Sequence, residues 1–224
     1  MTLDIRLDPR EARVFGVLVE KALTTPEQYP LSVNAATNGA NQKSNRDPVL
    51  SLSEDEVAAA LERLEQKYMA RKVFLMNSRV EKFCHNGKDA LNLDAAGLAV
   101  LAELLMRGPQ TPGDLRGRAS RMAPIDSLDQ LATILSTLIE RGYVQRLPPL
   151  PGSRAERYVQ LLSPDLHPLE PAGSAYAGGS SPAATPPSTS TALAARVATL
   201  EAEVERLREQ VRLLSEKLAR SPAD

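Results

Sequence analysis

The second half of this chain repeats the pattern of the first. The stretch SRVEKF at 78–83, for example, returns as SRAERY at 153–158. Each copy reads as three helical segments followed by a hairpin, which is the pattern of a winged helix. Four pairs of segments match in order: 7–8 with 93–94, 25–26 with 111–112, 57–61 with 131–135, and 78–83 with 153–158. We therefore predict an α+β, mainly helical fold with two tandem winged-helix domains, at 7–88 and 93–162.

The two copies differ in length between their second and third helices. Leu7 and Leu93 are 86 positions apart, whereas Val57 and Leu131 are 74 apart. The first copy therefore holds about a dozen extra residues. We expect this insertion around 38–50.

Capping residues indicate where the helices begin. Asp8 with Glu11, and Ser53 with Glu56, have the spacing of capping boxes, in which two side chains satisfy backbone amides at a helix start. The turn at 25–30 predicts the start of the second helix in the first copy. Further caps are expected at Asp94, Thr111 and Ser127.

Two short strands should close each copy. In the first copy we predict strands at 71–75 and 79–83, with a turn at Asn77-Ser78. In the second copy, the proline-rich stretch 148–152 should form the hairpin loop.

The strictest periodicity lies beyond the second copy. Residues 163–191 are rich in Pro, Ser, Gly, Ala and Thr, which predicts a disordered linker. Over 192–220, valine at heptad position a and leucine at d favour a parallel two-stranded coiled coil, and hence a homodimer. A single amphipathic helix docked on the protein's own body is the alternative. The predicted dimer interface consists of Leu193, Val197, Leu200, Val204, Leu207, Val211, Leu214 and Leu218.

Composition restricts the class of protein. The formal net charge is −1, so the chain lacks the global basic field that dominates nucleic-acid binding. Cys84 is the only cysteine, which excludes an internal disulfide and fits a reducing compartment. The first ten residues are too charged for a secretory signal, and no apolar run reaches membrane-spanning length. We predict a soluble, cytoplasmic protein without membrane contact.

Three unusual stretches carry a resemblance. TTPEQYPLS at 24–32, NQKSNRDPV at 41–49 and TPGDLR at 111–116 resemble the YceH-like family of bacterial proteins. The resemblance covers 7–162 and implies a tandem winged-helix fold in a bacterial cytoplasmic protein. It implies no activity, ligand or site residue, and it does not extend to the linker or the heptads.

The sequence offers little for catalysis. Its two histidines are His85 and His167, and the second falls in the predicted linker. Cys84 and His85 are neighbours at a strand end, so their side chains should point to opposite faces, which disfavours a Cys–His nucleophile pair. The common metal-binding, phosphate-loop and dinucleotide motifs are absent from the sequence. We predict no enzyme activity, no cofactor and no metal.

Winged helices often bind DNA through their third helix, and the residues here partly oppose that role. Glu54, Asp55 and Glu56 begin this helix in the first copy, and Asp126 and Asp129 lie there in the second. Carboxylates repel phosphates and cannot make the contacts that release counterions. Duplex DNA and a protein partner therefore stay open as alternatives.

The inserted loop of the first copy is one candidate contact region. Its amides and cations could bond to bases, phosphates or the backbone of a partner. The alternative is a solvated loop whose asparagines supply turns and left-handed positions. The candidate residues are Asn41, Gln42, Lys43, Asn45 and Arg46.

Arginines of the second copy form the other candidate region. Between Arg107 and Arg121, Asp114 is the only acidic residue, so this stretch could follow a phosphate backbone or an acidic protein surface. The alternative is an ordinary charged surface, because the copy has eight arginines and seven acidic residues. The candidates are Arg116, Arg118, Arg121, Arg154 and Arg157. We predict a non-enzymatic binding or adaptor protein, acting either in DNA-linked regulation or as a protein scaffold that does not touch DNA.

Overall fold

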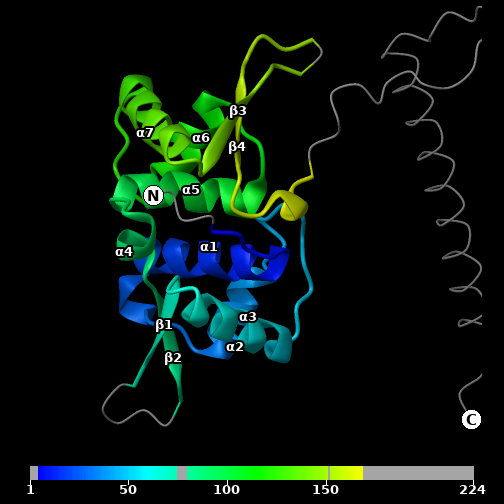
Figure 1. The fold of residues 1–224 in the computed structure, drawn as a ribbon, viewed down its shortest axis with the longest axis vertical. Coiled ribbons are helices and arrows are strands. Elements are labelled where there is room, and N and C mark those ends of the chain that lie inside the picture. The colour runs from blue at the N-terminus through cyan, green and yellow to red at the C-terminus, as the bar shows by residue number, and fades with distance from the viewer. Residues whose placement is uncertain (1–4, 75–79, 151, 169–224) are drawn as a thin grey trace, which may run out of the picture. The chain divides into compact units, whose positions relative to one another are not determined.

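The computed structural model describes residues 5–74, 80–150 and 152–168, which lie within one compact unit, residues 1–171. This part of the chain forms helices and two small antiparallel hairpins in the order expected from the repeat (Figure 1). The first copy consists of α1 (Pro9–Thr24), α2 (Val33–Ala40), α3 (Glu54–Gln66), β1 (Ala70–Val73) and β2 (Lys82–His85). After the short helix α4 (Gly87–Leu91), the second copy consists of α5 (Ala95–Arg107), α6 (Pro112–Ala119), α7 (Leu128–Glu140), β3 (Val144–Leu147) and β4 (Arg157–Gln160).

A backbone bridge adds a further partner to each hairpin. Leu31 exchanges two hydrogen bonds with Phe83, of 3.0 and 2.7 Å, and Gln110 exchanges two with Tyr158, of 3.1 and 2.9 Å. Phe83 and Tyr158 are the last residues of the matching stretches SRVEKF and SRAERY. The two copies therefore share one local topology in the described residues: helix, bridge, two helices and a hairpin.

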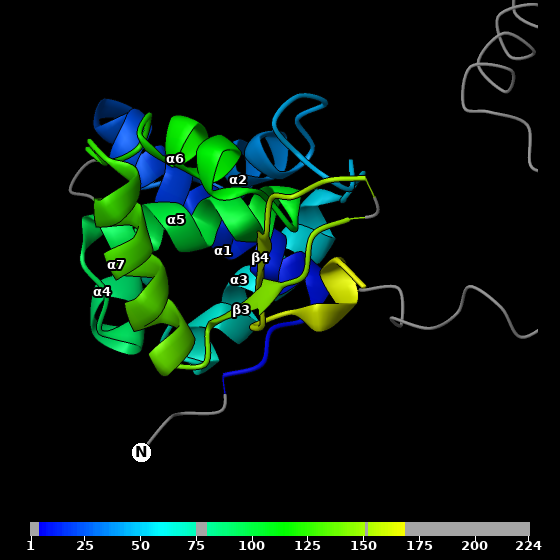
Figure 2. The same ribbon diagram turned by 90° about the horizontal axis from the view of Figure 1, so that it is seen from above.

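Helices α1 and α5 lie side by side and join the two copies (Figures 1 and 2). A Cβ on Gly16 of α1 would lie 3.0 Å from Cγ of Met106 and 3.6 Å from the carbonyl oxygen of Ala102, so glycine permits this close approach. Phe15 of α1 and Leu101 of α5 belong to the same buried cluster. One hydrophobic core thus runs through both copies, and the domain boundaries at 88 and 93 stay a prediction.

Helix starts that depend on local side-chain chemistry are confirmed. Asp8 accepts from the Glu11 amide at 2.9 Å, and the Glu11 carboxylate accepts from the Asp8 amide at 2.9 Å. Ser53 and Glu56 form the same reciprocal pair, with bonds of 3.2 and 2.9 Å. Side-chain caps also form at the positions expected in the second copy, Asp94, Thr111 and Ser127.

The predicted start of the second helix in the first copy is wrong. Pro26–Gln28 form only a 3-10 turn, and α2 begins at Val33, where the Ser32 side chain caps it. Pro30 explains the difference. It has no N–H, and it restricts Tyr29 to an extended conformation (φ −103°, ψ 142°), so a helix begun before it cannot continue.

The extra residues of the first copy are divided between a longer first helix, because α1 has 16 residues and α5 has 13, and the loops on either side of α2. Leu31 and Gln110 form equivalent bridges and are 79 positions apart in the sequence. Equivalent residues of the two copies are 86 positions apart where the copies start and 74 apart in their third helices. Seven of the twelve extra residues therefore precede α2, and five lie between α2 and α3. The prediction that all of them lie around 38–50 is corrected accordingly.

The first hairpin is shifted from its predicted position. The pairs run from Ala70↔His85 to Val73↔Lys82 in this hairpin, and from Val144↔Gln160 to Leu147↔Arg157 in the other. Phe83 pairs on both edges, with Lys72 and with Leu31, and this centres the strand on 82–85 rather than on 79–83. The turn predicted at Asn77-Ser78 lies outside the described residues.

Residues 163–168 belong to the folded unit, which corrects the predicted start of the linker. The buried Ser163 donates its amide to Oε1 of Gln160 at 2.7 Å, and Nε2 of Gln160 donates to the Ser163 carbonyl at 2.6 Å. The 3-10 turn Pro164–Leu166 then places Leu166 in the hydrophobic core. The rest of the predicted linker, 169–191, and the heptads at 192–220 lie outside the described residues.

Candidate binding surface

The loop between α2 and α3 crosses from the first copy to the end of α5 in the second. The Asp47 amide donates to the Met106 carbonyl at 2.8 Å, and the Arg107 guanidinium donates to Oδ1 of Asn45. The structure therefore brings together parts of two candidate regions that are far apart in the sequence. We name the following set the arginine surface: Asn45, Arg107, Arg118 and Arg121.

The guanidinium groups of this surface lie close enough to repel one another. Burial lowers the pKa of Arg107, and the charges of Arg118, Arg121 and Arg46 lower it further, while Glu103 opposes the shift. Oε1 of Glu103 lies 2.8 Å from Nε of Arg107 without the alignment of a hydrogen bond. Burial also raises the pKa of the Glu103 carboxyl, against the attraction of the nearby arginines. Positive charge is thus concentrated around one buried carboxyl group.

Helix α6 and the turn after it carry cations without acidic partners. Nη1 of Arg118 donates to Oε1 of Gln110 at 2.7 Å, and Nε2 of Gln110 donates to the Glu103 carbonyl at 3.3 Å. Neither Arg118 nor Arg121 forms an ion pair with any described residue. Their positive charges are therefore available to an anionic partner.

Two predicted contact residues of the loop are engaged by the loop's own structure. Arg46 is only 5% exposed, its Nη atoms contact both carboxylate oxygens of Glu20 at 2.6 and 3.2 Å, and its Nε donates to the Gly39 carbonyl at 3.1 Å. The amide of Asn41 holds the Leu52 backbone through two bonds of 2.8 Å. These contacts favour the structural interpretation for Asn41 and Arg46.

The other loop candidates lie further out. Lys43 and Asn45 are exposed, and Gln42 is half-buried. Asn45 has a left-handed backbone (φ 62°), which asparagine tolerates better than most residues. Lys43 forms no ion pair with a described residue. Lys43 and Asn45 are therefore the loop side chains most accessible to a partner.

The remaining predicted arginines are not joined to this surface. Nη1 of Arg116 donates to the Asp126 carbonyl at 3.2 Å, just before α7. Arg154 is exposed in the second hairpin, and Arg157 is half-buried in β4. No hydrogen bond or ion pair within the described ranges links these three arginines to the arginine surface.

The third helices are acidic at their starts, as the sequence indicates. Glu54 and Asp55 are exposed in the first turn of α3, and Glu54 accepts from Nδ2 of Asn34 at 2.7 Å. Helix α7 exposes Asp129 in its first turn and Ser136 further along. The accessible positive charge therefore lies on α6 and the loop instead of on the third helices.

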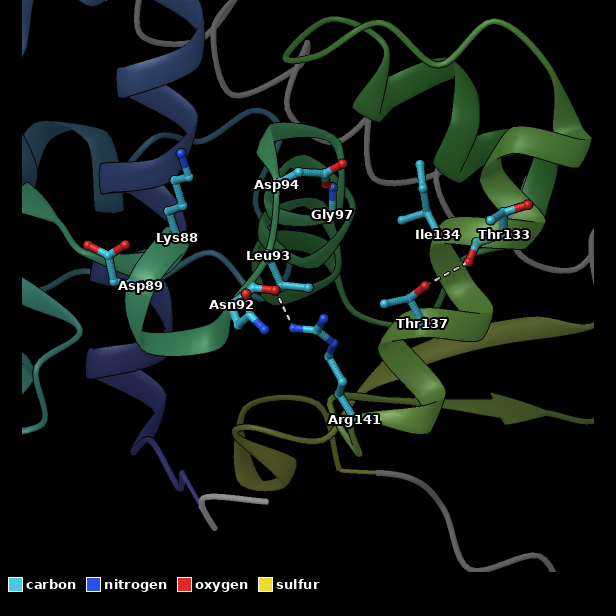
Figure 3. Close-up of a pocket in the computed structure, with 10 residues that line it drawn as sticks. All are labelled: Lys88, Asp89, Asn92, Leu93, Asp94, Gly97, Thr133, Ile134, Thr137 and Arg141. Carbon is cyan, nitrogen blue, oxygen red and sulfur yellow. Dashed lines mark hydrogen bonds between the residues drawn. The ribbon is translucent and has the colours of Figure 1, made fainter. Parts of the chain in front are cut away.

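A groove of about 670 Å³ lies between α4, the start of α5 and α7 (Figure 3). Side chains of both charges line it: Lys88, Asp89, Asp94 and Arg141. The guanidinium of Arg141 donates to the carbonyl of Leu91 at 2.9 Å and to that of Asn92. The sequence did not indicate this groove, because α4 is too short to show a helical period. In the structure, α4 ends at Asn92, which has a left-handed backbone (φ 53°).

Cys84 and His85 have separate environments. Sγ of Cys84 accepts from Nε of Arg71 at 3.1 Å, whereas the His85 ring packs against Phe15 and Tyr29, with ring centroids 6.4 and 6.0 Å away. Burial lowers the pKa of His85. In the described ranges, no three His, Cys, Asp or Glu side chains gather so that they could hold a metal ion. None of the described helices is both long and apolar enough to cross a membrane.

Comparison with known proteins identifies a family of unknown function. The family model described as "Protein of unknown function, DUF480" matches residues 7–153. A UPF0502 protein of Aeromonas hydrophila is 43% identical over 226 residues, which cover 97% of this chain and 98% of that protein. Another of Hahella chejuensis is 44% identical over 93% of both chains, and one of Geotalea daltonii is 50% identical over 72% and 74%. The chain therefore belongs to the DUF480 family of bacterial proteins, whose function is unknown.

Proposed function

We propose that this chain is a non-enzymatic binding protein built from two winged-helix units that share one core. The proposal is supported by the common topology of the two copies, including the equivalent bridges at Leu31 and Gln110. It is also supported by the separation of Cys84 from His85, the pair closest to a catalytic arrangement in the sequence.

The partner that we propose for the arginine surface is the phosphate backbone of duplex DNA. The observation that carries this proposal is that Arg118 and Arg121 stand beside Arg107 without an ion pair of their own among the described residues. A guanidinium group offers a planar fork of donors that matches phosphate oxygens, and each phosphate contact releases counterions. Lys43 is exposed on the loop that carries Asn45 and offers a further cation.

Binding of this kind is insensitive to base sequence. Phosphate contacts position a protein on DNA, whereas base edges in the grooves supply the sequence information. The acidic starts of α3 and α7 are unsuited to enter a groove lined by phosphates. A role in DNA-linked regulation would therefore depend on where other partners recruit the protein.

A protein scaffold that does not touch DNA is the second candidate. Helix α7 favours it, because Leu128 and Ile139 are 54% and 41% exposed on the same helix as the acidic Asp129. Exposed aliphatic side chains beside a carboxylate suit contact with another protein better than contact with phosphates.

We also propose that the chain forms a homodimer, is cytoplasmic and is related to the YceH-like family. The heptads at 192–220 support a homodimer through a parallel coiled coil. A single cysteine supports a cytoplasmic location, and the stretches at 24–32 and 41–49 support a relationship to the YceH-like family.

The test uses the full chain and a fluorescent DNA duplex in a salt titration. Arg118→Gln with Arg121→Gln should weaken binding to all duplex sequences and reduce the salt slope by about two, roughly one for each phosphate that the variant can no longer neutralise. Arg10→Gln with Lys72→Gln is the matched control, because both cations are already paired, with Glu56 and Glu81. The control removes the same charge and should leave the affinity within about twofold.

Equal reductions in affinity in both double variants would show that net charge, and not the arginine surface, governs binding. If the wild-type chain binds no duplex, DNA binding is excluded. A stoichiometric protein partner retained after nuclease treatment, and absent with a Leu128→Lys variant, would then support the scaffold.

A further inference from the structure

The segment after β4 returns to the loop that carries Asn45 and Arg46. His167, near the end of this segment, is 8% exposed and contacts Asp47, 120 positions earlier. Its ring also lies against Gly108, just after α5. A Cβ on Gly108 would come within 2.7 Å of Cδ2 of the His167 ring, so the absence of a side chain there leaves room for the histidine.

Both ring nitrogens of His167 have partners. Nε2 lies 2.6 Å from the Asp47 carbonyl oxygen, and Nδ1 lies 3.5 Å from Nε2 of Gln160. A carbonyl oxygen only accepts and an amide nitrogen only donates, so these partners assign a neutral ring with its proton on Nε2. The Gln160 amide is held in this orientation by its two bonds to the Ser163 backbone.

Asp47 is the point at which the segment meets the loop. Its amide donates to the Met106 carbonyl, and its own carbonyl accepts from His167. The next carbonyl, that of Pro48, accepts from Nη2 of Arg13 at 2.7 Å. The end of the loop is thus attached to α5, to α1 and to the segment after β4. Asn45 and Arg46 directly precede this point.

We propose that neutral His167 is a positioning residue for the arginine surface: it holds Asp47, and with it the loop 41–48, against the end of α5. The consequence for DNA binding rests on the function proposed above, whereas the positioning of the loop does not. Because Lys43 and Asn45 lie on this loop, release of Asp47 separates them from Arg107, Arg118 and Arg121.

Protonation of His167 would disturb this arrangement. A proton on Nδ1 would face the donor amide of Gln160, so the ring would have to leave one of its two partners. The hydrogen bond to the Asp47 carbonyl and the charge of Asp47 favour protonation, whereas the charge of Arg13 opposes it. Burial is the largest influence and lowers the pKa of His167, so the ring is neutral at pH 7.

The direction of the pH effect separates positioning from simple charge. A protonated histidine near a cationic surface would by itself strengthen binding to DNA. The positioning role gives the opposite result, a weaker affinity at acidic pH. A charged ring is costly to keep buried, so the protonated ring turns out to water and releases Asp47. The amide of Asp47 reports the state of the loop without any DNA, since its exchange with solvent requires opening of the bond to Met106.

The experiment compares His167→Gln and His167→Leu in the full chain, by amide exchange of Asp47 and by affinity for a DNA duplex. Glutamine can donate to the Asp47 carbonyl and does not titrate, whereas leucine fills space without a donor. We expect His167→Leu to lower the protection of Asp47 and the DNA affinity about fivefold each at neutral pH, and His167→Gln to keep both within about twofold. Between about pH 7.5 and about pH 5.5, wild type should lose affinity and His167→Gln should keep it.

The proposal is overturned if a folded His167→Leu protein protects Asp47 as well as wild type does. It is also overturned if wild type and His167→Gln lose affinity equally in acid. If His167→Leu does not fold, the proposal is tested by comparing the DNA affinity of wild type and His167→Gln at neutral and acidic pH. If no variant binds DNA, the proposed function fails, and the protection of Asp47 still decides the positioning role.

Discussion

Arg107 and Asn45, 62 positions apart in the chain, are joined by a hydrogen bond. This contact places residues of both copies on one surface. The equivalent loop of the second copy, between α6 and α7, spans 120–127 and is five residues shorter than 41–53. Because the contact depends on the longer loop, the arginine surface occurs once among the described residues, although the fold around it is repeated.

The ion pair between Arg46 and Glu20 should be essential for the loop. The Arg46 side chain is fully buried and that of Glu20 is half-buried, and a buried arginine without its carboxylate costs about 3 kcal/mol. We expect Glu20→Gln to lower the free energy of unfolding by about this amount in urea titrations. Glu62→Gln, at an exposed position on α3, should change it by less than about 0.5 kcal/mol. Similar values for the two variants would contradict the anchoring role of this pair.

Single substitutions in the loop should separate binding from stability. Lys43→Ala removes an exposed cation and should weaken DNA binding with a nearly unchanged melting temperature. Arg46→Ala leaves Glu20 without its partner and should lower the melting temperature by roughly 10 °C or more. Thermal unfolding and duplex titration of the same two proteins make the comparison. A stable Arg46→Ala protein that no longer binds DNA would instead indicate that Arg46 contacts the DNA.

The local sequence was enough to predict most helix starts, whereas the position of the second helix depends on long-range contacts. The caps at Asp8 and Ser53 form between residues three positions apart, so the sequence contains all that they need. The second helix was misplaced because Thr25-Pro26 has the sequence of a helix start, while Pro30 prevents its continuation. A pairing over 52 positions, between Leu31 and Phe83, determines the geometry there instead.

In the candidate site, too, local sequence identified the residues but long-range contacts determine their arrangement. Arginines and amides were identified by composition, but their meeting at Arg107 and Asn45 depends on how the two copies pack. Proline and serine made 163–168 resemble a linker. The contacts that fold this segment, such as that of His167 with Asp47, join residues far apart in the chain and leave no local pattern.

Stability should decrease in mild acid because of buried histidines. Burial lowers the pKa of both His85 and His167, so below about pH 6.5 the unfolded chain binds protons that the folded chain does not. This stabilisation is complete above about pH 6.5 and is lost as the pH falls through the lower folded pKa values. Burial raises the pKa of Glu103, which opposes part of the loss at still lower pH.

We expect the free energy of unfolding to be nearly constant between about pH 7 and 8, and to fall toward about pH 5.5. His167→Gln removes one of the two groups and should make this decline shallower by about half. Urea titrations at several pH values provide the measurement. A decline as steep in the variant as in wild type would assign the effect to other groups.

The heptads should make the full chain a dimer. Replacement of Leu207 and Leu214 by lysine puts charges at two d positions, where a parallel coiled coil buries leucine. We expect wild type to sediment as a dimer at micromolar concentration and this variant as a monomer with unchanged helix content in its folded unit. Glu205→Lys with Glu209→Lys alters the outer positions b and f and should remain dimeric. A wild-type monomer at tens of micromolar would contradict the predicted coiled coil.

Tyr68 and Gly142 occupy the same turn in the two copies, between the third helix and the hairpin. In both turns the following amide donates back to a helix carbonyl, from Met69 to Leu64 at 2.8 Å and from Tyr143 to Leu138 at 2.9 Å. Both residues have positive φ, 58° and 74°. This conformation is unfavourable by about 1 kcal/mol for a residue with a Cβ.

The turn should therefore be strained in the first copy and relaxed in the second. The Tyr68 side chain is 78% exposed, so it regains little by burial. We expect Tyr68→Gly to raise the free energy of unfolding by about 0.5–1 kcal/mol, and Gly142→Ala to lower it by about 1 kcal/mol. A Cβ on Gly142 would meet no atom within 4 Å, so any loss there comes from the backbone. Tyr68→Ala keeps the strain and removes the ring, and should be nearly neutral in the same urea titrations. A decrease of stability in both Tyr68 variants would instead reveal a stabilising contact of the ring.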